Sequence, residues 1–386
     1  MTASPFEALT RTGPSTPMGA LLRKYWQPLA VGADLPAGKA KPVRIMSEDL
    51  TLYRGQSGRP YVVGGRCAHR GTLLHTGWVE QESIRCRYHG WVFDGTGQCV
   101  EMPAEDPSYP PKVKIASYPT LEYKGLIFAY LGVGKPPPFP TRPELDRGTI
   151  HFAVGDPWPC NWFQGLENSM DSVHVAFVHS TSMFGQRLTT KVPTIEAEET
   201  EFGMRMTAAR SPENVRINEL HFPNQLHIRA VDMLDPNNAF WDTYVYYIPI
   251  DDEHHVQLCS FAAPLEGKGL EMWQRYLEKA AKLPKYRLME HHEDVFSGRM
   301  PPTDNGWFDF INAEDYIAQV GQGTLVDRNE EHLGKSDLAM ILMRRIWQRE
   351  LTEMQQGKPM KAWVTPKEPV DLPVPPPPKA VAGATG

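Results

Sequence analysis

The chain has 386 residues, of which 41% are hydrophobic and 22% charged, and its formal net charge at pH 7 is -6. This length suffices for two domains with separate cores, and the absence of a basic block argues against a nucleic-acid partner. No run of about 18 apolar residues and no secretory signal occur, so neither a membrane span nor export is expected. The 5 cysteines are too few for a disulfide scaffold, which favours a cytoplasmic protein with reduced thiols.

The predicted elements begin with a helix and continue as short strands. Apolar residues recur at helical spacing over residues 18–30, up to a break at Pro28. Short apolar runs then alternate with turn residues, which predicts strands at 43–45, 50–53, 61–63, 91–93 and 126–131. Asp94-Gly95 predicts a hairpin turn. We assign residues 1–25 to an N-terminal segment with a helix, and residues 26–132 to an all-β domain.

A proline-rich linker separates this β domain from the rest of the chain. Residues 133–150 contain five prolines, which stiffen the backbone towards the polyproline conformation. Strand-like stretches follow at 204–208, 225–230, 241–250 and 255–262, and helix-like stretches at 271–282, 314–320 and 337–354. This mixture predicts an α+β domain over residues 151–364, with an antiparallel sheet flanked by helices. Residues 365–386 are rich in proline and lack apolar periodicity, so a disordered tail is expected.

Two short segments of the β domain each offer one cysteine and one histidine. Cys67 and His69 are separated by one residue, and Cys86 and His89 by two. Zinc sites of this composition usually pair Cys with Cys and His with His. A 2Fe–2S centre with two thiolates on one iron and two imidazoles on the other uses mixed segments instead. Tyr88 and nearby glycines can donate hydrogen bonds to the sulfurs of such a cluster.

A second set of candidate ligands follows in residues 160–179. Asp171 and His174 are three residues apart and would be neighbours on a helical face. His174 and His179 are five apart, which on an ideal helix separates them by about 140°. Both can meet one metal only if the helix ends or distorts between them. Two histidines and one carboxylate are the ligands of many non-haem Fe(II) oxygenases. The alternative interpretation is that His174 and His179 are two unrelated histidines on a helix.

Spacing alone does not select the carboxylate. The acidic candidates downstream are Asp294, Asp304, Asp309, Glu314, Asp315 and Asp327. The run His-His-Glu-Asp at 291–294 is more typical of a polar helix face than of a site.

The motifs together resemble a known family. The segment 66–99 closely resembles the Rieske centre of ring-hydroxylating oxygenases, and the segment around Asn168 and Asp171 is similar to their mononuclear iron motif. With LLRKYWQPLA at 21–30 and INAEDYIAQVGQG at 311–323, the match covers most of the chain and resembles the phthalate-dioxygenase-like group. The resemblance implies an all-β Rieske domain followed by a helix-grip-like catalytic domain.

The resemblance also implies cofactors and site residues. A Rieske 2Fe–2S cluster would be held by Cys67, His69, Cys86 and His89, and a mononuclear Fe(II) by His174, His179 and Asp315. Asp171 would accept the free ring N–H of His174 and that of a cluster histidine from a neighbouring subunit, which implies a homotrimer or a multiple of it. Asn168 and Tyr88 are expected beside the ligands.

Membership of this family would make the chain a terminal oxygenase. It would take electrons from a flavin- or ferredoxin-type NAD(P)H reductase and use O2 to hydroxylate, by mono- or dioxygenation, or to O-demethylate a small aromatic substrate, expected to be an aromatic carboxylate. The candidate partners of the carboxylate are Arg205, Arg210 and Arg229. The alternatives are an electron-transfer or sensor Rieske protein without oxygenase activity, and a zinc-binding structural protein. The remaining cysteines are interpreted as small buried residues: Cys99, Cys160 and Cys259.

Overall fold

The computed structural model describes residues 6–180, 191–230, 241–263, 293–299 and 310–373, with single helical positions at 271, 274 and 278. The chain divides into a β unit, residues 11–140 with 248–252, and a mixed unit made of the remaining residues. Several predicted features lie outside the described residues: most of the helix at 271–282, His291, His292, Asp304, Asp309 and the tail beyond 373. In the described part of the chain no helix is both long and apolar enough to cross a membrane.

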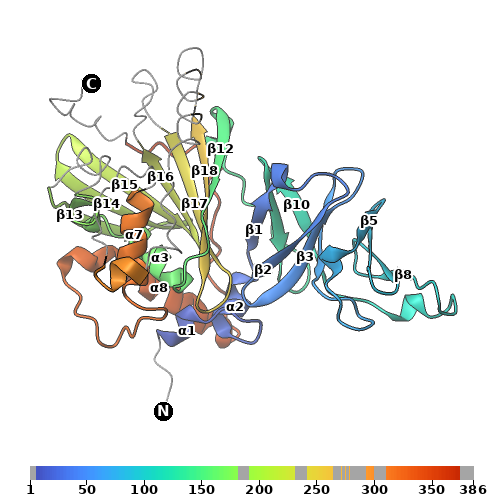
Figure 1. The fold of residues 1–386 in the computed structure, drawn as a ribbon. Coiled ribbons are helices and arrows are strands. Elements are labelled where there is room, and N and C mark those ends of the chain that lie inside the picture. The colour runs from blue at the N-terminus through green and yellow to red at the C-terminus, as the bar shows by residue number, and fades with distance from the viewer. Residues whose placement is uncertain are drawn as a thin grey trace. The chain divides into compact units, whose positions relative to one another are not determined.

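The β unit contains three antiparallel sheets (Figure 1). The first has the strand order β1–β11–β10, formed by Trp26–Val31, Leu126–Tyr130 and Thr120–Tyr123. The second has the order β2–β3–β4–β9, formed by Ala40–Ile45, Glu48–Arg54, Pro60–Gly64 and Ser117–Tyr118. The third has the order β5–β6–β7–β8, formed by Trp78–Glu80, Ser83–Arg85, Val92–Asp94 and Cys99–Glu101. The predicted strands and the hairpin after residue 93 are confirmed.

The helix predicted over residues 18–30 is shorter than expected. Helix α2 (Pro17–Leu22) begins after Thr16, whose hydroxyl accepts a backbone hydrogen bond at 3.1 Å. The helix ends at its sixth residue, and Trp26 begins strand β1 instead. The Trp26 indole donates to the Pro137 carbonyl at 3.0 Å. The prediction was wrong beyond α2 because residues 26–31 pair with β11 as a strand instead of continuing the helix.

The mixed unit is built around a seven-stranded sheet within the described residues. Its strand order is β12–β18–β17–β16–β15–β14–β13, and every pair whose register is described is antiparallel. The strands are Thr149–Val154 (β12), Thr194–Glu199 (β13), Gly203–Ser211 (β14), Asn214–His221 (β15), Gln225–Ala230 (β16), Trp241–Pro249 (β17) and His255–Ala263 (β18). All four predicted strands of this region are confirmed.

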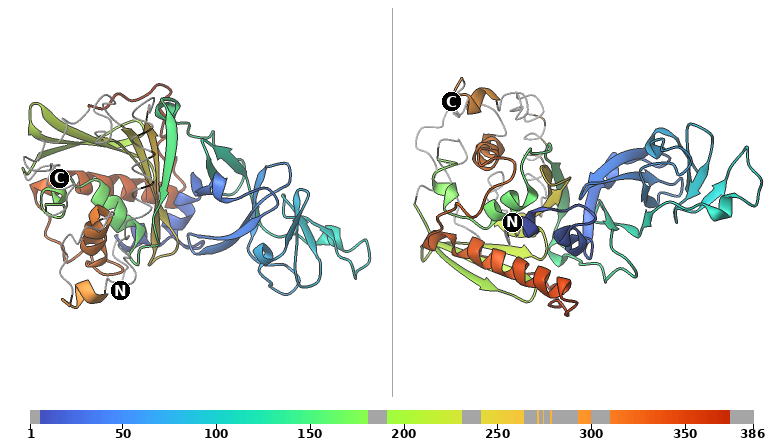
Figure 2. Two further views of the ribbon diagram at one scale, coloured as in Figure 1. Left: turned by 45° about the horizontal axis from the view of Figure 1, so that its top comes forward. Right: turned by 90° about the horizontal axis from the view of Figure 1, so that it is seen from below.

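Three longer helices lie on one face of this sheet. The helices of the unit whose bounds are described are α1 (Glu7–Thr10), α3 (Trp162–Ser169), α7 (Phe310–Val320) and α8 (Leu338–Gln355). Asn218 of β15 donates to the Ser169 carbonyl at the end of α3, at 2.7 Å. Trp347 of α8 packs against Phe222 with ring centroids 4.6 Å apart, and Figure 2 shows α8 lying along the sheet. Helix α7 in turn packs against α3. The expected antiparallel sheet with flanking helices is therefore confirmed.

Glu167 holds α3 against two other segments. Its carboxylate accepts hydrogen bonds from Arg328 at 2.7 and 3.0 Å and from Arg344 of α8 at 2.6 Å. All three residues are buried, so water does not screen these ion pairs. Arg344 also donates to Glu331 at 3.0 Å. Glu331 thus supplies the second negative charge that balances the two arginines. The network therefore fixes the helix from which the candidate metal segment departs.

Glu167→Gln should lower the free energy of unfolding by about 3–5 kcal/mol, because two buried guanidinium groups lose the anion that they share. Thermal unfolding followed by far-UV circular dichroism measures the effect. Glu330→Gln removes an exposed carboxylate and is the matched control, expected to change the melting temperature little. Equal, small shifts for the two variants would show that the network does not hold the fold.

Candidate active site

Two loops of the β unit are near copies of each other. One follows β4 and the other joins β6 to β7. In each loop the cysteine N–H, of Cys67 or Cys86, donates at 2.8 Å to the carbonyl five residues further on. A glycine N–H returns to the cysteine carbonyl, from Gly71 at 2.9 Å and from Gly90 at 3.1 Å. Both glycines have a φ near +76° (75° and 77°), which glycine adopts without strain. The two glycines therefore let each loop close tightly around its ligands.

The loops bring two thiols together and two imidazoles together. Cys67 and Cys86 are buried, and burial raises the pKa of Cys67 to about 11. The ring centroids of His69 and His89 are 4.5 Å apart. His69 also stacks on Trp91, and its buried Nδ1 has no hydrogen-bond partner among the described residues. This division into a sulfur pair and a nitrogen pair fits a cluster with thiolates on one iron and imidazoles on the other.

The rim of these loops is aromatic and positively charged. The Tyr88 ring lies 3.8 Å from the His89 imidazole, centroid to centroid, and the Arg70 guanidinium stands 5.4 Å above the Tyr88 ring. Arg87 stands over the exposed ring of Trp78 in the same way, at 4.6 Å. The expected hydrogen bond from the Tyr88 hydroxyl to a cluster sulfur stays a prediction.

The candidate metal segment of the mixed unit begins where α3 ends. Regular helix stops at Ser169, and the chain then turns through Asp171 into the 3-10 helix η5 (His174–Ala176). The Asp171 carboxylate stabilises this turn by accepting the Val173 N–H at 2.7 Å. Asp171 and His174 are therefore neighbours across a turn, and the expectation that they share a helical face was wrong. The same turn supplies the break that lets His174 and His179 converge.

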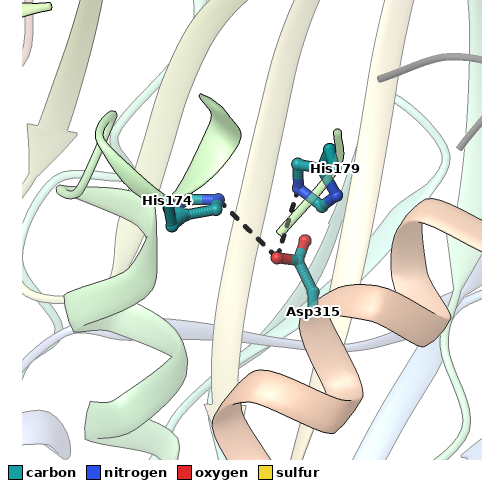
Figure 3. Close-up of side chains that lie close together, drawn as sticks. All are labelled: His174, His179 and Asp315. Carbon is teal, nitrogen blue, oxygen red and sulfur yellow. Dashed lines mark ion pairs between the residues drawn. The ribbon is translucent and has the colours of Figure 1, made fainter. Parts of the chain in front are cut away.

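Asp315 of α7 points toward both histidines (Figure 3). His174 Nε2 is 3.6 Å and His179 Nε2 is 3.4 Å from the same atom, Asp315 Oδ1. The side chain of His174 is 15% exposed, that of His179 is 5% exposed and that of Asp315 is 19% exposed. The three candidate ligand atoms lie within 4.8 Å of one another, as expected for atoms that surround one ion at about 2.0–2.2 Å. The structure thus brings together the set predicted from the sequence.

A carboxylate stands behind each of these histidines. His174 Nδ1 is 3.6 Å from Asp171, and His179 Nδ1 is 2.9 Å from Glu314. Metal-bound histidines usually donate their second ring N–H to such a group, which fixes the ring and its tautomer. Burial opposes charge on His179, but the hydrogen bonds that its ring donates to Asp315 and Glu314 raise its pKa to about 9. Burial likewise opposes charge on Asp171, yet contact with His174 leaves the Asp171 pKa below its ordinary value.

The other acidic candidates that lie in the described ranges do not reach this centre. Glu314 is buried beside Asp315, but it faces the far nitrogen of His179 and so orients a ligand. Asp294 and Asp327 make local contacts near the surface instead. The role of Glu314 was missed from the sequence, where it was weighed only as an alternative ligand. Adjacent residues of a helix point about 100° apart, so an acidic pair can approach one imidazole from two sides.

Two further polar groups border the site. The Asn168 side-chain amide donates to Asp315 Oδ1 at 3.4 Å, which places Asn168 beside the ligands as expected. Tyr247 of β17 is buried on the helix-covered face, and burial raises the pKa of its hydroxyl above the ordinary value. The sequence contained no signal for Tyr247, because its position follows from the register of the sheet.

Comparisons with known proteins match both halves of the chain. Residues 25–119 match the Rieske [2Fe-2S] domain, and residues 136–372 match the LigXa C-terminal domain like family. The 5,5'-dehydrodivanillate O-demethylase oxygenase subunit of Sphingobium sp. (strain NBRC 103272 / SYK-6) is 32% identical over 382 residues, covering 94% of this chain and 83% of that protein. The phthalate 4,5-dioxygenase oxygenase subunit of Pseudomonas putida is 29% identical over 380 residues, covering 91% and 86%.

A solved structure shares the fold. The terminal oxygenase of carbazole 1,9a-dioxygenase from Novosphingobium sp. KA1 superposes with a TM-score of 0.63 at 19% sequence identity. The superposition covers 94% of this chain and 97% of that one. The order of an all-β domain and a larger domain with an antiparallel sheet and helices is therefore the fold of a known structural class.

Two variants should separate the ligand from the acid that orients it. Asp315→Ala should abolish binding of the mononuclear iron, because the set of three ligands loses its only anion. Glu314→Gln should keep this iron but weaken its affinity about 10–100-fold, since His179 loses its orienting partner. Fe(II) titration and iron content after gel filtration measure both effects. If Asp315→Ala kept its full mononuclear iron and Glu314→Gln kept none, Glu314 would be the ligand and Asp315 the acid that orients His179.

Proposed function

The chain belongs to the family of Rieske oxygenase subunits with a LigXa-like C-terminal domain, and from this membership we propose that it hydroxylates or O-demethylates an aromatic carboxylate. Members of the family are oxidoreductases with a Rieske 2Fe–2S cluster and a mononuclear iron. When bound, the cluster supplies electrons one at a time and the iron supplies a site for activating O2. One observation carries the proposal: two histidines and one aspartate converge beside two arginines that have no acidic partner among the described residues.

The residues that would hold the two groups follow from their donor atoms. The thiols of Cys67 and Cys86 suit one iron of the cluster, and the imidazoles of His69 and His89 suit the other. The three converging side chains of the mixed unit suit a mononuclear iron and leave coordination positions open for oxygen. Their shielding from water strengthens each electrostatic contact with a bound ion.

We propose that Asp171 couples the iron site to an electron donor. One carboxylate oxygen faces His174, and 38% of the Asp171 side chain is exposed. The exposed part can accept a second hydrogen bond, from a cluster histidine of a neighbouring copy of the chain. His89 is exposed and can donate it. Contacts of this kind between identical subunits can close in a ring, and we expect a homotrimer or a multiple of it. We further expect that a flavin- or ferredoxin-type NAD(P)H reductase supplies the electrons.

Two arginines on the helix-covered face of the sheet lack an acidic partner in the described part of the chain. Arg210 of β14 donates only to backbone carbonyls, one of them that of Ser172 at 3.2 Å. Arg216 of β15 donates only to the Asn218 side-chain oxygen, at 3.1 Å. Burial lowers the pKa of both groups, and the nearby charge of Arg210 also contributes to lowering that of Arg216 to about 10. Two such cations are stabilised by a bound anion.

The anion would lie close to the iron. Ser172, which Arg210 contacts, is two residues before His174. The other candidates from the sequence, Arg205 and Arg229, pair with buried acids at 2.6 and 3.0 Å and are not available. Phthalate, which gives one relative its name, is an aromatic dicarboxylate. We therefore propose that both guanidinium groups hold the substrate carboxylate while the ring faces the iron.

Asp171→Asn should leave the visible absorption of the cluster unchanged and lower product formation about 100-fold, because an amide cannot accept at both oxygens. The informative readout is reoxidation of the pre-reduced cluster by O2 with substrate present, at saturating Fe(II). Reoxidation should slow in Asp171→Asn and not in Asp156→Asn, which changes an exposed carboxylate. Normal reoxidation and turnover in Asp171→Asn would show that Asp171 takes no part in electron transfer from the cluster to the iron.

Arg216→Gln should lower kcat/KM for an aromatic acid about 10–100-fold, mainly through KM, because a charged hydrogen bond contributes about 1.5–3 kcal/mol. Mass spectrometry of the products from a panel of aromatic acids and their neutral amides measures the change. Arg345→Gln, at an exposed position of α8, is the control and should behave as the wild type. An unchanged preference for acids over amides in Arg216→Gln would show that the carboxylate is bound elsewhere.

A further inference from the structure

The face of the sheet opposite α3, α7 and α8 carries a separate cluster of buried polar side chains. Side chains alternate along β15, so Asn218 faces the helices whereas Glu219 and His221 face the other side. His227 of β16 is paired directly with Glu219 and so joins them on that side. None of these three residues takes part in the iron site, which lies on the helix-covered face.

Three donor atoms of this cluster point at one another. Glu219 Oε2 is 3.7 Å from His221 Nε2 and 3.6 Å from His227 Nδ1, and the three side chains are 0–3% exposed. The three candidate ligand atoms lie within 4.8 Å of one another. These separations are too long for hydrogen bonds. Ligand atoms around a tetrahedral zinc ion are about 3.3 Å apart, so a small relaxation would close the cluster around an ion.

The atoms that face one another have no other hydrogen-bond partner. Within the described residues this holds for both ring nitrogens of His221, for His227 Nδ1 and for Glu219 Oε2. An unsatisfied buried polar atom costs about 1–3 kcal/mol, so four in one cluster indicate a partner that the described residues do not supply. A proton on His227 would give Glu219 a charged neighbour, but it would leave His221 unsatisfied.

The surroundings are those of a metal-bound histidine. His227 Nε2 is 3.1 Å from Asp242 Oδ1, so the ring can donate there and keep a lone pair on Nδ1. Arg205 donates to the other oxygen of Glu219, Oε1, at 2.6 and 3.0 Å and leaves Oε2 facing the histidines. Tyr244 stacks on His227 at 4.5 Å between ring centroids and fixes the ring plane.

We propose that Glu219, His221 and His227 form a second metal site, structural in role, for a divalent transition-metal ion of the zinc class. Two imidazoles and one carboxylate are ligands that zinc accepts, and imidazole favours transition metals over Mg²⁺ and Ca²⁺. A water molecule completes the four-coordinate shell. The ion ties β15 to β16 beside the turn that links them. The positive charge of Arg205 weakens binding, so the site fills when zinc is supplied rather than by scavenging traces.

The test uses the iron-loaded protein and zinc sulfate. Wild type, Glu219→Gln and His227→Gln are incubated with zinc and gel-filtered, and their metals are counted by mass spectrometry. Glu198→Gln, which removes an exposed carboxylate on strand β13, is the matched control. Wild type and control should retain about one zinc per chain, and the two ligand variants at least about tenfold less. The zinc K-edge spectrum of the wild type should show only nitrogen and oxygen neighbours, at about 2.0–2.2 Å.

Cluster absorption and iron content are recorded in parallel. Unchanged values show that each variant is folded and that zinc has not replaced iron, so the outcome is independent of the proposed oxygenase activity. The proposal is overturned if the wild type retains no zinc, if Glu219→Gln retains as much as the wild type, or if zinc enters only as iron leaves. Sulfur neighbours in the wild-type spectrum would place the zinc at the cysteine loops and would also overturn the proposal. Because this spectrum is recorded on the wild type, it remains decisive even if a variant fails to fold.

Discussion

The end of α3 at Ser169 is the constraint on which the candidate iron site depends. A helix continued through His179 would direct the two histidines about 140° apart, beyond the reach of one ion. In such a helix the Ser169 carbonyl would accept the N–H of Val173. Instead that carbonyl accepts the Asn218 side chain of β15, and the Asp171 carboxylate takes the Val173 N–H. The sheet and one acidic side chain thus replace the hydrogen bond that would have continued the helix.

The same arrangement recurs at three of the histidines that face a candidate ion. A carboxylate stands at the second ring nitrogen: Asp171 behind His174, Glu314 behind His179 and Asp242 behind His227. At His179 and His227 the carboxylate is within hydrogen-bond distance, so it holds the ring in one orientation and one tautomer before any ion arrives. In the iron site the acids come from the turn after α3 and from α7, so the ligands converge only after the helices have packed. On the opposite face, neighbouring strands place all members through the register of the sheet.

The sequence predicted the ligand sets better than the groups that support them. Cys67 and Cys86 stand in short local patterns, and Asp315 was selected by resemblance to a family segment; their assignment as ligands stays a prediction, but the structure places each set together. The helix over 18–30 was overestimated because the apolar spacing after α2 also suits a strand. Glu314 and Arg216 could not be assigned, because their roles depend on the rotation of α7 and on which face of β15 meets the helices.

The most direct test of the central claim is turnover under ¹⁸O2. The protein, loaded with cluster and iron and reduced by a surrogate reductase, is given a panel of aromatic carboxylates, and the products are analysed by mass spectrometry. An oxygenase with this site incorporates label from ¹⁸O2, one atom in monooxygenation and two in dihydroxylation. A cluster that is reduced and reoxidised while every acid is recovered unchanged and unlabelled would contradict the claim. That outcome would leave electron transfer as the function.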